Sequence, residues 1–174
     1  MEKVKVTQDV VYQYMLEHNV SLSDLAREMQ ANATMVAACF KRNADRNGKP
    51  RHFTAATLPR LNEGLSKFAA QMRQCVIPFG SNQVYTNHWG ATYDPATVEP
   101  IRQLANYFNL TALVVRVLGW SKTKKSAIIS DVHSKAFGCV SRDDVNRLNA
   151  ELLAVAGVLS SYEIIPDEED SSSI

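Results

Sequence analysis

The chain has 174 residues, of which 45% are hydrophobic and 21% are charged, a composition that excludes a disordered chain because enough apolar surface exists to offset chain entropy. The formal net charge of +1 argues against tight nonspecific binding to polyanions. The N-terminus lacks the apolar run of a signal peptide and the longest apolar stretch, residues 152–159, is too short to span a bilayer, so a cytoplasmic protein without a membrane partner is predicted.

The first part of the chain predicts a series of helices. Apolar residues recur at helical spacing over residues 8–17. A short helix follows behind Ser21 or Ser23, because either hydroxyl can cap the free amides of a first helical turn. After a turn, a third helix is expected to begin at Asn32. Beyond it, the polar loop NADRNGKPRH leads to a long helix capped by Thr54.

The second half of the chain repeats segments of the first half. Three pairs of segments match in the same order, with a gap of two residues between the first two pairs and of one residue between the last two: 21–34 with 110–123, 54–69 with 141–156, and 76–78 with 164–166. One match places Arg60-Leu61-Asn62 on Arg147-Leu148-Asn149, at a shift of 87 residues. Because three ordered matches are harder to obtain by chance than one, the sequence predicts an internal duplication.

The predicted fold is all-α, with two diverged copies of one helical unit. Its expected organisation is a first unit, a linker or small extended arm, a second unit and a disordered acidic tail, over residues 1–78, 79–95, 96–166 and 167–174. Short strands are expected in the linker and near Val76-Ile77 and Ile164-Ile165, where β-prone pairs precede a proline.

The order of these helices is the layout of a helix-turn-helix domain. Residues 21–29, SLSDLAREM, resemble the second helix of the phage-repressor family, the Cro and lambda-repressor-like proteins, with Leu25-Ala26 facing the core. Residues 32–36, NATMV, resemble the start of the recognition helix of that family. The resemblance covers about sixty residues, through Phe68, and is weaker in the second copy. It implies sequence-specific binding of double-stranded DNA by a repressor-like transcriptional regulator.

The starts of the two third helices carry the residues assigned to DNA. A helix N-terminus attracts phosphate, and short side chains in its first turn let it approach the base edges in the major groove. The base-facing assignments are Asn32, Ala33, Thr34, Ala37 and Ala38 in the first unit and Lys122 and Lys124 in the second. The phosphate-binding assignments are Lys41, Arg42, Lys49, Arg51 and Lys125, of which the first four belong to a basic strip interrupted only by Asp45.

Alternative interpretations remain for the basic segments and for the assembly. The lysines near Ser121 lie at a predicted helix start, where cations cost stability unless a polyanion lies nearby, yet a solvated charged face has the same composition. The two units can act as an intramolecular pseudo-dimer on two half-sites, or the chain can pair as a homodimer.

A protein-interaction adaptor, or an antirepressor-like protein that no longer binds DNA, is the alternative function. A protein-binding surface would expose leucine, methionine or aromatic side chains, whereas a DNA-binding surface exposes lysine and arginine. An enzyme is not predicted, because nucleotide-binding and hydrolase motifs are absent from the sequence. No cofactor or metal site is predicted either, since the histidines and cysteines lack ligand spacing.

Overall fold

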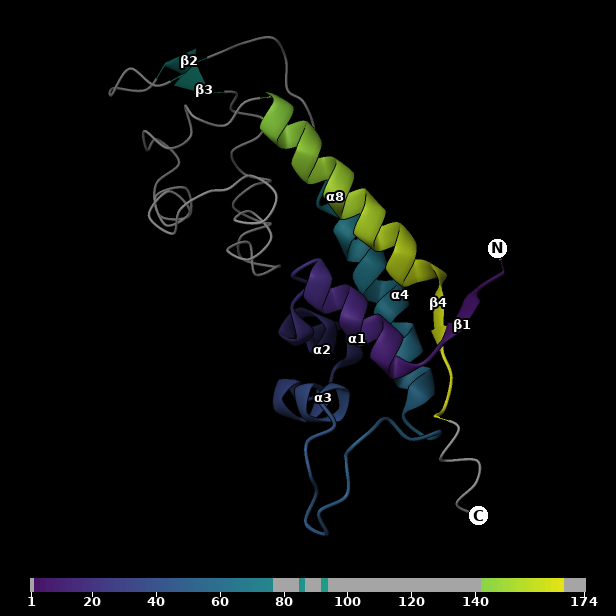
Figure 1. The fold of residues 1–174 in the computed structure, drawn as a ribbon. Helices are drawn as coiled ribbons and strands as arrows, with labels where there is room; N and C mark the ends of the chain where they lie inside the picture. The colour runs from purple at the N-terminus through teal and green to yellow at the C-terminus, as the bar shows by residue number, and fades with distance from the viewer. Residues whose placement is uncertain (1, 77–84, 87–91, 94–141, 168–174) are drawn as a thin grey trace. The chain divides into compact units, whose positions relative to one another are not determined.

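The computed structural model describes residues 2–76, 85–86, 92–93 and 142–167 (Figure 1). The helices in these ranges are α1 (Gln8–Glu17), α2 (Leu22–Met29), α3 (Ala33–Phe40), α4 (Leu58–Gln74) and α8 (Arg142–Ser161). The strands are β1 (Val4–Val6), β2 (Tyr85–Thr86), β3 (Thr92–Tyr93) and β4 (Tyr162–Ile164). The described part of the chain is mainly helical, as predicted.

Side-chain caps mark the starts of α2 and α3, the second and third helices of the chain. α1 covers the predicted residues 8–17. Ser21, rather than Ser23, caps α2, and its hydroxyl accepts a hydrogen bond from the backbone N–H of Asp24 at 3.4 Å. α2 ends at Gln30, whose left-handed backbone turns the chain toward α3. Asn32 caps α3, because its Oδ1 accepts from the backbone N–H of Met35 at 3.1 Å.

The long helices α4 and α8 begin close to the predicted positions. α4 begins at Leu58, four residues after Thr54, because a turn precedes it in which the Thr54 carbonyl accepts from the backbone N–H groups of Thr57 and Leu58. α8 begins at Arg142, one residue beyond Ser141, which aligns with Thr54 in the predicted repeat and lies outside the described residues.

α4 and α8 bury side chains at matching positions. The aligned pairs, at the shift of 87 residues, are Leu61 with Leu148, Leu65 with Leu152, Phe68 with Val155, Ala69 with Ala156, and Met72 with Leu159. This match agrees with the alignment of residues 54–69 with 141–156. The other helices predicted for the second copy lie in residues 94–141, outside the part of the chain that the structure describes.

β1 and β4 join the two ends of the chain in a parallel pair, with Val4 opposite Tyr162 and Val6 opposite Ile164 (Figure 1). The side chain of Asn62 in α4 binds the backbone of β4 through two hydrogen bonds. Its Nδ2 donates to the Ile164 carbonyl at 3.1 Å, and its Oδ1 accepts from the Ile164 N–H at 2.7 Å. A strand near Ile164 was expected. β1 was not expected, and Val76 does not lie in a strand.

The compact units of the chain do not follow its linear order. One unit contains residues 1–71 together with 155–174, and the other contains residues 72–154. The predicted division placed the end of α8 and β4 with the second copy, whereas the pairing of β1 with β4 brings them into the first unit. In the linker, where short strands were expected, β2 and β3 pair antiparallel, with Tyr85 opposite Tyr93.

A close approach between α2 and α4 holds the helices of the first unit together. Gly64 of α4 lies against Met29 of α2, and a Cβ at this glycine would overlap the Met29 Cγ. Arg60 of α4 donates to the carbonyls of Met29 at 2.8 Å and Gln30 at 2.5 Å, which would otherwise lack a partner at the end of α2. α2 is therefore anchored to α4 before the chain enters α3.

Candidate nucleic-acid interface

α3 has one buried side and one exposed side. Val36 and Phe40 are buried, and Phe40 packs edge-on against Phe53, with ring centroids 4.8 Å apart. On the other side, Asn32, Thr34 and Met35 are exposed, and the Met35 side chain is 63% exposed. Ala33, Ala37 and Ala38 are half-exposed. The five residues that the sequence assigned to base edges in the first unit are therefore all at least partly accessible.

The loop after α3 is an ordered hairpin, residues 43–51. The backbone N–H of Arg51 donates to the Asn43 carbonyl at 2.9 Å, and that of Asp45 donates to the Lys49 carbonyl at 2.8 Å. Ala44 and Pro50 form an antiparallel bridge between the two arms. Gly48 supplies the positive φ of +77° that the tight tip requires. The hairpin therefore has a defined backbone instead of being an open polar loop.

Asp45, the acid within the basic strip, organises the tip of this hairpin. Its Oδ1 accepts hydrogen bonds from the backbone N–H groups of Asn47 at 2.8 Å and Lys49 at 3.0 Å. These bonds, first that from Lys49 and then that from Asn47, lower the pKa of the carboxyl. Asp45 thus holds the loop whose arms carry the cations. The exposed cations that flank α3 are Lys41 at its end and Arg46, Lys49 and Arg51 on the hairpin.

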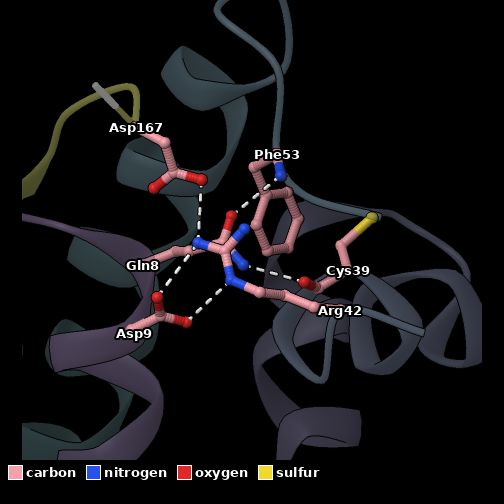
Figure 2. A network of polar contacts seen from close by, with 6 residues as sticks. All are labelled: Gln8, Asp9, Cys39, Arg42, Phe53 and Asp167. Carbon is pink, nitrogen blue, oxygen red and sulfur yellow. Dashed lines mark hydrogen bonds and ion pairs between the residues drawn. The ribbon is translucent and has the colours of Figure 1, made fainter. Parts of the chain in front are cut away.

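Arg42 differs from the other cations of the strip, because two carboxylates already bind it (Figure 2). Its Nε and Nη2 donate to the two carboxylate oxygens of Asp9 at 3.1 and 3.0 Å, and Nη2 also donates to Asp167 at 2.7 Å. The hydrogen bond from Asp9 is the largest cause that raises the pKa of the guanidinium. Arg42 was assigned to phosphate, but its observed contacts join the end of α3 to α1 and to the segment after β4.

Gln8 is a structural residue near this site that the sequence analysis did not single out. Its Nε2 donates to the Cys39 carbonyl at 2.8 Å, and its Oε1 accepts from the backbone N–H of Phe53 at 2.9 Å (Figure 2). The side chain therefore ties both the end of α3 and the segment after the hairpin to α1. A polar residue one helical turn before Val11 and two before Met15, on the buried side of α1, was the available signal.

Burial disfavours ionisation of the thiols of the two described cysteines. Cys39 and Cys75 are free and half-buried. Burial raises the pKa of Cys39, and it raises the pKa of Cys75 to about 11, so both thiols stay protonated near neutral pH. The remaining cysteine, Cys139, lies outside the described residues.

The described residues were also compared with the requirements of a metal site and of a membrane-spanning helix. In residues 2–76 and 142–167, His, Cys, Asp and Glu do not gather in a group of three that could hold a metal ion. None of the described helices is long and apolar enough to cross a bilayer. The assigned residues Lys122, Lys124 and Lys125 fall outside the part of the chain that the structure describes.

The chain was compared with known proteins at three levels. Comparison with models of protein families, with curated proteins and with solved structures gives no match.

Proposed function

We propose that the chain binds double-stranded DNA in a sequence-specific manner and acts as a repressor-like transcriptional regulator, with α3 in the major groove. One observation carries this proposal: the accessible side of α3 bears no carboxylate and is flanked by the exposed cations Lys41, Arg46, Lys49 and Arg51. Cations bind the phosphate backbone, and short side chains on a helix let it approach the base edges. The resemblance of residues 21–36 to phage repressors supports the same arrangement.

Each residue has a defined part in this proposal. Ala33, Thr34, Ala37 and Ala38 face the base edges, Asn32 caps α3 beside them, and Lys41, Lys49 and Arg51 bind phosphates. Arg42 positions the end of α3 instead, because a guanidinium bound by two carboxylates does not attract a further anion. In the second unit, Lys122 and Lys124 face bases and Lys125 binds phosphate. The two units then occupy two half-sites as a pseudo-dimer, or two chains pair on one operator.

Binding of a protein partner is the second candidate, and the exposure of Met35 favours it. Met35 is 63% exposed on the accessible side of α3, and methionine is a side chain that adaptable protein-binding surfaces use. An adaptor or antirepressor-like protein would use this face without DNA. The cations around α3 favour DNA, because an apolar protein-binding groove does not require them.

Selection from random duplex DNA at two salt concentrations tests the proposed function, because it separates specific, nonspecific and absent binding. The triple variant Arg46→Ala, Lys49→Ala, Arg51→Ala is expected to weaken binding to all sequences. It should also reduce the slope of log affinity against log salt by about 0.9 for each phosphate that the variant no longer neutralises. Lys5→Ala, which removes an exposed lysine in β1, is the matched control and should leave the slope unchanged. Failure to enrich any duplex at either salt concentration would contradict the proposal.

A further inference from the structure

We infer that α3 distinguishes bases mainly through the 5-methyl group of thymine, with Met35 as the central contact. This inference rests on the proposed DNA binding and names the chemical feature that is recognised. The helix reads ATMVAACF, so it carries no charged or amide side chain and only one hydroxyl, that of Thr34. Bidentate hydrogen-bond readout of base edges depends on arginine, lysine, asparagine or glutamine side chains, whereas a threonine hydroxyl is not selective for one base. α3 itself offers none of these groups.

The geometry of α3 places apolar atoms where a base edge would lie. Helical spacing puts Thr34, Met35 and Ala38 opposite the buried residues Val36 and Phe40. Met35 is more exposed than any other large apolar side chain in the described part of the chain. The thymine methyl is the apolar group that the major groove presents, and its contact with an exposed apolar side chain removes surface of both from water.

The hydrogen bonding of Asn32 also favours base recognition through apolar side chains. Bidentate recognition of adenine requires the asparagine carboxamide to accept from N6 and donate to N7 at the same time. The Oδ1 of Asn32 instead accepts from the backbone N–H of Met35 at 3.1 Å, which turns the carboxamide toward its own helix. Asn32 therefore caps α3, and the discrimination falls to the apolar side chains beside it.

The distribution of charge around α3 favours DNA as the partner of its exposed face. α3 contains no acid, and exposed cations lie at its end and on the hairpin, at Lys41, Arg46 and Lys49. A surface that is apolar at its centre and cationic at its edge complements a groove in which methyl groups lie between two rows of phosphates. Duplex DNA rich in thymine is the ligand that matches both properties.

The test replaces single thymines by uracil in a selected duplex, which removes the methyl group and keeps every hydrogen-bonding group. The full chain is expected to bind about fourfold more weakly at one or two positions, the fold-change that corresponds to one buried methyl group. Met35→Ala should reduce the thymine-to-uracil affinity ratio at one of these positions to about one. Leu16→Ala, which shortens an exposed apolar side chain of α1, is the matched control and should keep the ratio.

The outcomes separate this inference from the function on which it rests. If the selected duplex binds but uracil replaces thymine at every position without loss, methyl recognition is overturned and DNA binding stands. The same holds if Met35→Ala keeps the ratio at every position. If no duplex is enriched, both proposals fail.

Discussion

Gln8 shows how one side chain can connect three segments of the chain. It is 2% exposed, and a buried carboxamide must satisfy both its donor and its acceptor. Both find backbone partners, the carbonyl of Cys39 and the N–H of Phe53. Because these groups lie at the end of α3 and after the hairpin, Gln8 determines how both connect to α1.

Replacing Gln8 by methionine is expected to destabilise the fold by about 1–3 kcal/mol, because similar volume is kept while the buried N–H of Phe53 loses its partner. Urea unfolding followed by circular dichroism measures the change. Gln13→Met is the control, since Gln13 is exposed and bonds only Glu17 at the surface, and it should change stability by less than about 0.5 kcal/mol. Equal effects of the two substitutions would show that the Gln8 bridge does not stabilise the fold.

Two substitutions of Asp45 are predicted to change DNA affinity in opposite directions. Asp45→Asn keeps an oxygen acceptor for the hairpin and removes a negative charge, so DNA affinity should rise. Asp45→Ala removes the same charge and also the acceptor, so the hairpin loosens and affinity should fall. Duplex affinity measured at one salt concentration distinguishes the two variants. A rise in both would mean that Asp45 is only an interrupting charge.

The pKa of Asp45 determines the pH range of this effect. A carboxyl whose pKa is lowered in the folded state stabilises the hairpin fully above its usual pKa, which is about 3.9. That contribution is lost as the pH falls through the lowered value. The hairpin is therefore fully organised at neutral pH, where the comparison of the Asp45 variants is made.

At the scale of elements, the contact between α2 and α4 depends on glycine at position 64, which has no side chain. Gly64 allows the two helices to meet at Met29, whereas Gly157 in α8 has open space around the position of a Cβ. Alanine favours a helix over glycine at both positions, so the two glycines separate helix propensity from packing. The close approach, and not the helix itself, requires glycine at position 64.

Gly64→Ala is expected to destabilise the fold by about 1–3 kcal/mol, because the new methyl overlaps Met29 in a packed interface. Gly157→Ala is the matched substitution in the other long helix and should stabilise by about 0.5–1 kcal/mol. Thermal unfolding of both variants gives the comparison. A stabilising effect of Gly64→Ala would mean that α2 and α4 move apart without cost.

At the scale of the whole molecule, the last described residues complete the first compact unit. β4 pairs with β1, Asn62 binds the backbone of Ile164, and Arg42 binds Asp167. The backbone N–H of Ile165 also donates to the Val6 carbonyl at 2.8 Å. The unit that contains α1, α2 and α3 therefore depends on residues at the other end of the sequence.

Adjacent isoleucines test this dependence. Ile164 is 2% exposed and Ile165 is 36% exposed, so Ile164→Ala should cost about 2–5 kcal/mol and Ile165→Ala less than about 1 kcal/mol. Hydrogen exchange should show faster exchange in α1 for Ile164→Ala, because β4 contacts that helix. Unchanged protection of α1 would contradict the interpretation that the C-terminal strand stabilises the N-terminal helices.

The sequence by itself determined the helices α1, α2 and α3, because helical periodicity and the capping of α2 and α3 by short polar side chains are local interactions within a few residues. It also predicted the long helix α4, which begins four residues after Thr54. Only the tertiary structure decided that β1 pairs with β4 and that Arg42 binds Asp167, which is 125 residues away. Interactions between residues so far apart in the sequence depend on the tertiary fold that brings them together. A pattern within a few residues does not specify that fold. For this reason the exposed face of α3 followed from its sequence, while the neutralisation of Arg42 beside it did not.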